Sequence, residues 1–241
     1  MKQYKMVIID GVIILVTCVS IVLFLNFVVF AKLKKGQTSD SLVTMIQQDS
    51  AERVTEILSD KEFDKMKENK PATLDEYKKM RANKADEYGR TPLMWLAYAN
   101  NADNKFTLES DAKRVPMVET LAAAGADLNA QDNDGWTALM WASWSGLKDV
   151  ASKLIEKGAD LKIVDKKGNS ALLIAAQAGR TDIVKTLLDK GADRLAQNSS
   201  NKTAKDLAEE FMKRFPKKAE DYKSILALLD APVVQAAVSS K

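Results

Sequence analysis

The fold is decided by the stretch "DNDGWTALMWASWSGLKDVASKLIEKGAD", residues 132–160. It has the pattern of a turn, a short helix ended by glycine, and a second short helix closed by Gly-Ala-Asp. The same pattern returns in "DKKGNSALLIAAQAGRTDIVKTLLDKGAD", residues 165–193, and Gly-Ala-Asp also occupies 125–127. These three tripeptides are 33 residues apart, and a fixed period of that length indicates a repeat architecture.

Two further segments align with this period, "DEYGRTPLMWLAYAN" (86–100) and "NSSNKTAKDLAEEF" (198–211). Gly89 precedes Gly135 by 46 residues, which is one repeat plus an insertion of 13 residues at about 100–112. This polar insertion is predicted to be a surface loop between two helices. The last segment lacks the turn glycine and Gly-Ala-Asp, and we interpret it as a polar terminal cap whose outer helix is basic and contains Pro216.

The residues at the helix ends support this interpretation. Hydroxyl side chains stand where each first helix begins and can cap its free N–H groups: Thr91, Thr137, Ser170 and Thr203. Pro92 occupies the first helical position, which tolerates its missing N–H. A glycine suits a left-handed helix end at Gly125, Gly158 and Gly191. Small residues let first helices approach one another (Ala97, Ala142, Ala175), and leucines are predicted on the buried face of second helices (Leu121, Leu154, Leu187).

These motifs resemble the ankyrin repeat, and the resemblance covers roughly residues 84–208. It implies an all-α solenoid of helix pairs that bury their apolar faces only by stacking. Where that family commonly has histidine after Thr-Pro-Leu, this chain has Met94, Met140 and Leu173. The expected organisation is an anchor (1–31), a linker (32–40), a repeat domain (41–230) and a tail (231–241). Within the domain we expect a capping repeat at 41–83, repeats at 84–131, 132–164 and 165–197, and a C-terminal cap at 198–230.

Three of the four tryptophans lie within residues 136–144. In the ankyrin pattern, the turn tip and the two ends of the inner helix form the concave face that contacts a partner. The resemblance therefore assigns partner binding to Tyr88, Arg90, Tyr98, Trp136, Trp144, Lys166, Asn169 and Gln177. Trp95 and Trp141 fall in the middle of inner helices and are predicted to pack between repeats. Tryptophan, tyrosine and arginine are the types that dominate binding hot spots.

The N-terminal stretch 6–31 is strongly apolar, and Gly11 to Ala31 are 21 residues without a charge. A helix of that length rises about 30 Å, the thickness of the hydrocarbon core. We predict a single transmembrane helix, with a cleaved signal peptide ending at Ala31 as the alternative. Lysines flank both ends almost equally, and their balance favours an N-in anchor with the domain exported.

Asp10 precedes the uncharged run. It can sit at the membrane interface, or it can be a buried carboxylate that faces a partner helix or a proton path. The second option resembles the early aspartate of single-span subunits in proton-driven motors. It supports an alternative function, in which the chain is an accessory or scaffold subunit of a membrane complex and Asp10 serves assembly or proton handling.

Composition excludes several classes of function. The chain has 241 residues and no histidine, which removes His-based general acid–base chemistry and the commonest zinc ligand. The single cysteine, Cys18, lies in the apolar run. Beyond residue 35 the chain carries 31 basic and 32 acidic residues, which is not the basic excess of a nucleic-acid binder.

The sequence therefore predicts a non-enzymatic module of the inner membrane. Its ankyrin domain would lie on the periplasmic or extracytoplasmic side, as in membrane-attached bacterial ankyrin proteins. We expect a protein partner on the concave face, a lipid bilayer around residues 6–31, possible contact with other membrane subunits, and no cofactor, metal or nucleic acid. An enzyme that uses carboxylates such as Glu109 and Asp111 is the least favoured alternative, because no motif organises them.

Overall fold

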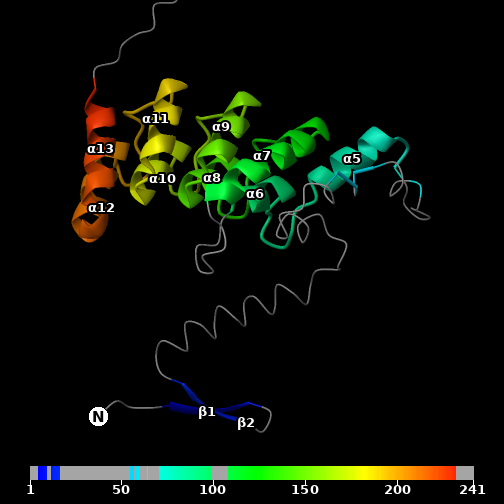
Figure 1. Ribbon diagram of the computed structural model, residues 1–241, viewed down its shortest axis with the longest axis horizontal. Coiled ribbons are helices and arrows are strands. Elements are labelled where there is room, and N and C mark those ends of the chain that lie inside the picture. The colour runs from blue at the N-terminus through cyan, green and yellow to red at the C-terminus, as the bar shows by residue number, and fades with distance from the viewer. Residues whose placement is uncertain are drawn as a thin grey trace, which may run out of the picture.

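The computed structural model describes residues 5–9, 12–16, 71–98 and 108–231, with positions 55, 56, 58, 59 and 64. Most of these residues form a row of helices joined by short turns (Figure 1). After α5 (Leu74–Ala82), helices follow in pairs. They are α6 (Pro92–Ala97) with α7 (Leu108–Ala123), α8 (Ala138–Ser145) with α9 (Lys148–Glu156), α10 (Ala171–Ala178) with α11 (Thr181–Asp189), and α12 (Ala204–Arg214) with α13 (Ala219–Asp230). The 3-10 helix η2 (Pro216–Lys218) joins the last pair.

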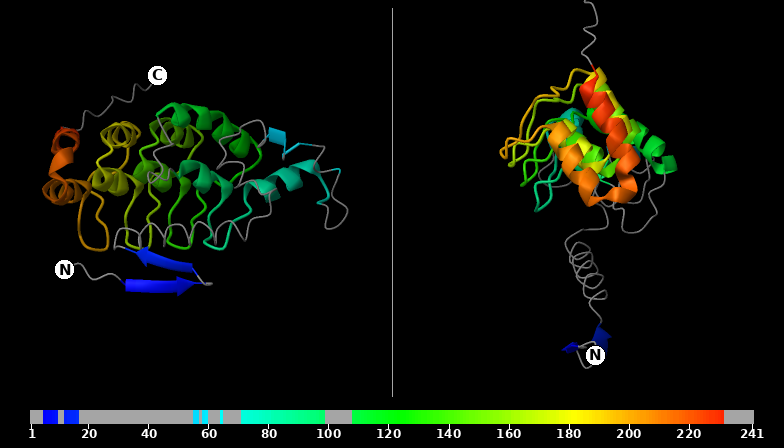
Figure 2. Two further views of the ribbon diagram at one scale, coloured as in Figure 1. Left: turned by 60° about the horizontal axis from the view of Figure 1, so that its bottom comes forward. Right: turned by 90° about the vertical axis from the view of Figure 1, so that its left-hand side faces the viewer.

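The pairs are arranged in two rows. Helix α6 packs on α8, α8 on α10, and α10 on α12, which makes an inner row. Helices α7, α9, α11 and α13 make an outer row beside it. Figure 2 shows both rows along the stack, with the turns projecting from one side. The predicted stack of helix pairs is therefore confirmed.

Each inner helix begins where the sequence predicted. The hydroxyls of Thr91, Thr137, Ser170 and Thr203 accept hydrogen bonds from the N–H three residues further on. Pro92 stands at the start of α6. Helices of 6 to 11 residues are marginal alone, so packing against neighbours must supply most of their stability.

Tight turns precede the inner helices. Gly135 and Gly168 have φ of 84° and 76°, and Asn201 takes the same place in the last repeat with φ of 56°. Asparagine tolerates this left-handed conformation better than most residues, which explains how the cap keeps its turn without glycine. A Cβ on Gly168 would also lie 2.8 Å from the backbone nitrogen of Ser199, so neighbouring turns approach closely.

Backbone hydrogen bonds connect the turn tips of successive repeats. Asn133 N–H donates to Tyr88 C=O at 2.9 Å, and Lys166 N–H donates to Asp134 C=O at 3.1 Å. Ser199 N–H continues the series to Lys167 C=O at 2.9 Å. These bonds join neighbouring turn tips in the same way from repeat to repeat.

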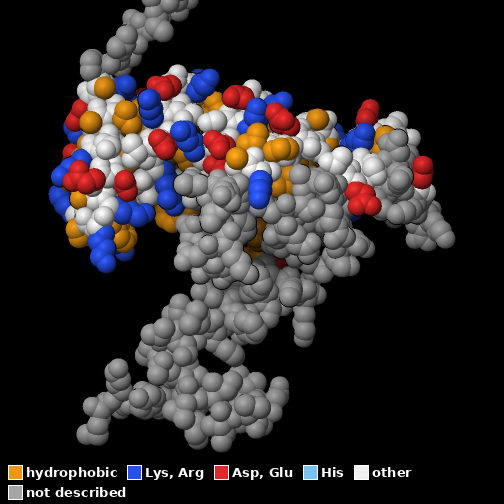
Figure 3. Space-filling view, in the orientation of Figure 1, with side chains coloured by type: hydrophobic (Ala, Val, Ile, Leu, Met, Phe, Trp, Pro, Cys, Tyr) orange, Lys and Arg blue, Asp and Glu red, His pale blue; other side chains and the backbone are white. Residues whose placement is uncertain are grey.

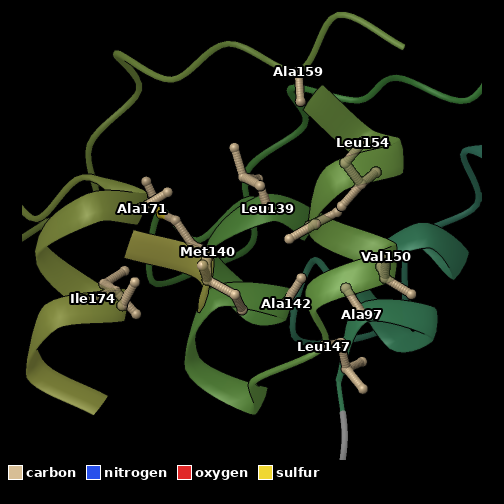
Figure 4. Packing of buried hydrophobic residues seen from close by; sticks show 14 of the residues in the cluster. Ala97, Leu139, Met140, Ala142, Leu147, Val150, Leu154, Ala159, Ala171 and Ile174 are labelled. Carbon is tan, nitrogen blue, oxygen red and sulfur yellow. The ribbon is translucent and has the colours of Figure 1, made fainter. Parts of the chain in front are cut away.

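The core lies between the two rows and continues from repeat to repeat (Figure 4). The inner alanines and outer leucines predicted to be buried are inaccessible to solvent: Ala97, Ala142, Ala175, Leu121, Leu154 and Leu187. No single pair encloses these side chains. The stack therefore depends on neighbour contacts, as expected for a solenoid.

Two predicted boundaries were wrong. Residues 108–112 belong to α7 rather than to a loop, because Asp111 and Arg114 are used as buried partners of other helix ends. The last repeat has no single basic outer helix; its chain divides into inner α12, η2 and outer α13. Pro216 causes this break, because proline disfavours helical backbone at the preceding Phe215, which has φ −124° and ψ 70°.

The N-terminal segment differs from the predicted helix. Strands β1 (Lys5–Ile9) and β2 (Val12–Val16) pair antiparallel, with Ile9 opposite Val12. The helical prediction was wrong for these residues because a short β-branched apolar run fits a strand as well as a helix. Among the residues with described structure, none of the helices has the length and apolar character needed to span a bilayer. Asp10, Gly11, residues 17–31, the predicted linker 32–40, most of the predicted capping repeat 41–83, residues 99–107 and residues 232–241 lie outside the described residues.

Candidate functional site

Five of the predicted site residues gather at the first two repeats. Tyr88 and Arg90 lie in the turn before α6, and Tyr98 directly follows that helix. Trp136 precedes α8, and Trp144 lies in its last turn. Because the tips of these turns are hydrogen-bonded to each other, the two repeats present these side chains together.

The rings of these two repeats form a continuous series. Trp95 meets Tyr98 edge-on with centroids 5.9 Å apart, and Tyr98 meets Trp141 at 5.2 Å. Trp136 then lies 4.6 Å from Trp141 and 6.2 Å from Trp144. We call Trp95, Tyr98, Trp141, Trp136 and Trp144 the aromatic row. Such contacts contribute about 0.5–1.5 kcal/mol each beyond the area they bury.

Exposure changes along the aromatic row. Trp95 is buried, with 6% of its surface accessible, whereas Trp144 is 40% exposed. Tyr98, Trp136 and Trp141 are half-buried. The row therefore runs from the core to the surface, and its outer end is open to a partner.

Asp86 and Asp132 fix the two inner tryptophans. The Trp95 indole N–H donates to Asp86 Oδ2 at 2.9 Å, and the Trp141 indole N–H donates to Asp132 Oδ2 at 3.0 Å. The other oxygen of each carboxylate accepts N–H groups of its own turn. The predicted packing role of Trp95 is confirmed by its burial, and Trp141 is anchored in the same way.

Neither aspartate was among the predicted site residues, although both position the rings. The sequence contained a signal for them, because an aspartate precedes a tryptophan by nine residues in both repeats. Met94 occupies the place where the family commonly has histidine, and its sulfur accepts the Thr91 N–H at 3.4 Å.

Arg90 lies among the rings at the inner end of the row. Its guanidinium carbon is 4.8 Å from the Trp141 centroid, 5.4 Å from Trp95 and 5.3 Å from Tyr88. In the described part of the chain, no carboxylate forms an ion pair with this guanidinium. Cation–π contacts of this kind are worth about 0.5–2 kcal/mol and hold the side chain in place.

The remaining predicted residues lie on the third repeat and behave differently. Lys166 is exposed at the turn tip, and Gln177 is half-buried. Asn169 is buried, with 8% exposure, because its amide donates to Asp165 Oδ2 at 3.1 Å and accepts from Asn198 at 2.9 Å. This network closes two turns and leaves Asn169 little accessible surface, so we do not include it in the docking surface proposed below.

Asp111 has a structural role at the start of helix α9. Its two carboxylate oxygens accept the N–H groups of Asp149 and Val150 at 2.8 and 3.1 Å, at the start of α9. Burial raises the pKa of Asp111 above its usual value, although the two backbone hydrogen bonds oppose that rise. Among described residues, no group of three or more potential ligands is placed to hold a metal ion.

An open hollow of about 640 Å³ lies between α5 and the turns that follow, and its lining includes Gly89 and Thr91 on either side of Arg90. It is lined by side chains such as Glu76, Lys79 and Asn83, together with glycine and alanine. It has none of the aromatic residues that mark the row, so we place the candidate site on the row.

Comparison with known proteins agrees with the repeat geometry. The family described as ankyrin repeats (3 copies) matches residues 106–198. The ankyrin match begins after α6 and ends before α12, whereas the stack continues on both sides of it. No curated protein matches the chain. Ankyrin repeats are generally non-catalytic modules for protein–protein interaction.

Proposed function

We propose that this chain is a non-enzymatic interaction module whose protein partner docks on the aromatic row and the adjoining turn tips. One observation carries the proposal: the series of five rings ends at Trp144, which is 40% exposed. On the first turn, the Arg90 guanidinium lies against Tyr88, which is 43% exposed. Soluble domains rarely expose such clusters without a function. Tryptophan, tyrosine and arginine are also the residues that supply most binding energy at interfaces.

The anchoring of the rings supports the same proposal. Asp86 and Asp132 hold two indoles by hydrogen bonds, and those indoles hold Tyr98 and Trp136 by ring contacts. Binding then costs little side-chain entropy on this surface, because its rings are already ordered before a partner arrives.

Site-specific photocrosslinking in cells tests the location of the docking surface. A benzophenone side chain is introduced at Trp144 in the full chain, and at Lys185 on the exposed side of outer helix α11 as the control. We expect one adduct of defined mass from position 144 and none from position 185. Adducts from position 185 alone would place the partner on the outer row and refute the assignment.

We also propose that residues 6–31 attach the chain to the inner membrane and that the repeats face the periplasmic side. The support comes from the sequence: the run from Gly11 to Ala31 is apolar and uncharged and has flanking lysines, although Val12–Val16 of this run form strand β2. A reporter fused after Lys241 and protease access in spheroplasts test this topology. If an intact inner membrane protects the repeats from protease, the repeats face the cytoplasm and the proposed orientation is wrong. If alkaline carbonate releases the chain, the proposed attachment to the membrane is wrong.

The alternative role, as accessory subunit of a membrane complex, rests on Asp10 alone. Asp10→Asn should abolish the function of such a complex while leaving the amount of protein unchanged. A variant that behaves as wild type would eliminate this alternative.

A further inference from the structure

Arg90 determines what kind of partner the aromatic row can accept. We infer that the row binds an acidic peptide segment, with a partner carboxylate on the Arg90 guanidinium and an apolar or aromatic neighbour on Trp136 and Trp144. This inference rests on the proposed function and specifies the chemistry of its partner.

Ring contacts fix the position of the Arg90 guanidinium, but no carboxylate among the described residues pairs with its charge. Three rings surround it at 4.8–5.4 Å, and within the described part of the chain its N–H groups donate to no acceptor. The Asp86 carboxylate is engaged with the Trp95 indole and with the backbone of the turn. A planar guanidinium that stacks on rings keeps the donor edge that binds a carboxylate through two hydrogen bonds.

The same geometry argues against a cationic ligand. An aromatic cluster with empty ring faces suits a quaternary ammonium or methylated lysine. Here Arg90 already lies against Tyr88, Trp95 and Trp141, and a second cation would meet like charge at short range. An anionic group is the ligand that gains from this arrangement.

Charges along the turn tips extend this preference toward the third repeat. Lys166 and Lys167 are exposed, and neither forms an ion pair within the described residues. The first two tips carry the exposed acids Glu87 and Asp134 besides Arg90, whereas the third tip carries two lysines and no exposed acid, so exposed positive charge is concentrated on the third tip. A segment with an acid beside an aromatic residue, and further acids on its third-repeat side, complements this surface.

A displayed library of random decapeptides tests the inference. The full chain is immobilised, and bound peptides are sequenced for wild type, Arg90→Gln, Arg90→Lys and Lys185→Gln. A decapeptide reaches about 33 Å, which is enough to cross several turns. Lys185→Gln removes the same charge from exposed outer helix α11 and is the matched control.

For wild type we expect at least tenfold enrichment of Asp or Glu at a position next to an aromatic residue. Arg90→Gln should lose the acidic enrichment and keep the aromatic one, and Arg90→Lys should retain only part of it, because lysine lacks the planar fork. Lys185→Gln should match wild type. Thermal unfolding midpoints equal to that of wild type show that the variants are folded.

The outcomes separate this inference from the proposed function. Enriched peptides without an acidic preference, with a basic preference, or with an acidic preference unchanged in both Arg90 variants, would overturn the inference while leaving peptide binding intact. Enrichment of no peptide by any variant would overturn the proposed function itself.

Discussion

At the scale of single residues, one aspartate per repeat organises both a turn and a ring. Asp132 Oδ1 accepts the N–H groups of Asp134 and Trp136 at 2.9 and 2.8 Å, and Oδ2 accepts the Trp141 indole. In the third repeat Asp165 keeps the backbone bonds, but the amide of Asn169 replaces the indole. The aromatic row therefore ends at the second repeat, because the third repeat has Asn169 in place of a tryptophan as the partner of its aspartate.

Asp132→Ala removes three hydrogen bonds to a buried carboxylate. Hydrogen bonds to charged groups contribute about 1.5–3 kcal/mol each. Because water can replace the carboxylate at the freed N–H groups, we expect the free energy of unfolding to fall by about 2–3 kcal/mol in total. Urea unfolding measures this loss. Asp134→Ala changes an exposed carboxylate of the same turn and should cost about 0.5 kcal/mol or less. Equal losses in both variants would contradict the assigned role of Asp132.

At the scale of helices, side chains from outside each helix satisfy its ends. The Tyr98 and Leu96 carbonyls at the end of α6 accept from Arg114 of α7. The Trp144 carbonyl at the end of α8 accepts from Arg180 Nε at 3.1 Å. The Gln177 carbonyl of α10 accepts from the Tyr222 hydroxyl at 2.9 Å. These donors tie the helices together as well as capping them.

Helix starts could be predicted from the sequence because each capping hydroxyl is three residues from the N–H it binds. The partners of the helix ends could not, because residues 144 and 180, or 177 and 222, are brought together only by the stack. Asp111 shows the consequence. It was assigned to a polar loop, and its role became apparent only beside α9, 38 residues further along the chain.

Asp111→Ala should destabilise the chain by about 1–2 kcal/mol, because α9 has no side-chain cap of its own at Leu147. Chemical denaturation measures the loss. Lys113→Ala, an exposed change on the same helix, is the control and should have little effect. A wild-type midpoint for Asp111→Ala would show that the carboxylate does not cap α9.

The raised pKa of Asp111 also predicts a pH dependence. The folded state keeps the proton to a higher pH than the unfolded state, whose carboxyl has the ordinary pKa of 3.8. Stability from this group is therefore greatest below pH 3.8 and falls as pH rises through the folded pKa. The free energy of unfolding of wild type minus that of Asp111→Asn should decrease over that interval. A difference that increases with pH would mean that the pKa is lowered instead.

At the scale of the whole molecule, the stack is a chain of neighbour contacts. Helix α13 contacts α11 and α12, and α12 contacts α10, while α6 and α8 are remote from this end (Figure 1). Figure 3 shows charged side chains of both signs over the visible surface of the stack. Stability in such an array is approximately a sum of local terms.

Ile225→Ala should cost about 2–5 kcal/mol, because its side chain on α13 is completely buried. Amide hydrogen exchange should show the loss of protection mainly in α11, α12 and α13, with α6 and α8 little affected. Leu195→Ala, at a leucine that is 75% exposed, is the control and should leave exchange unchanged. A uniform loss over the whole stack would instead show that the domain unfolds as one cooperative unit.

The repeat register made the stack and most of the site predictable. Once Gly135 is aligned with Gly89, the positions of Trp136, Trp144, Tyr88 and Arg90 on the turn side follow from the sequence. The register did not predict the hydrogen bonds that bury Asn169, because they join side chains of two different turns. Exposure at a given repeat position depends on such contacts as well as on the register.

The most direct measurement is the affinity of the crosslinked partner for wild type, Trp144→Ala and Leu195→Ala, by titration calorimetry. If the open end of the aromatic row is the binding surface, Trp144→Ala weakens binding by more than about 1 kcal/mol, or about fivefold in Kd. Leu195→Ala removes another exposed apolar side chain and should leave Kd unchanged. An unchanged Kd for Trp144→Ala, or an equal loss for Leu195→Ala, would contradict the account.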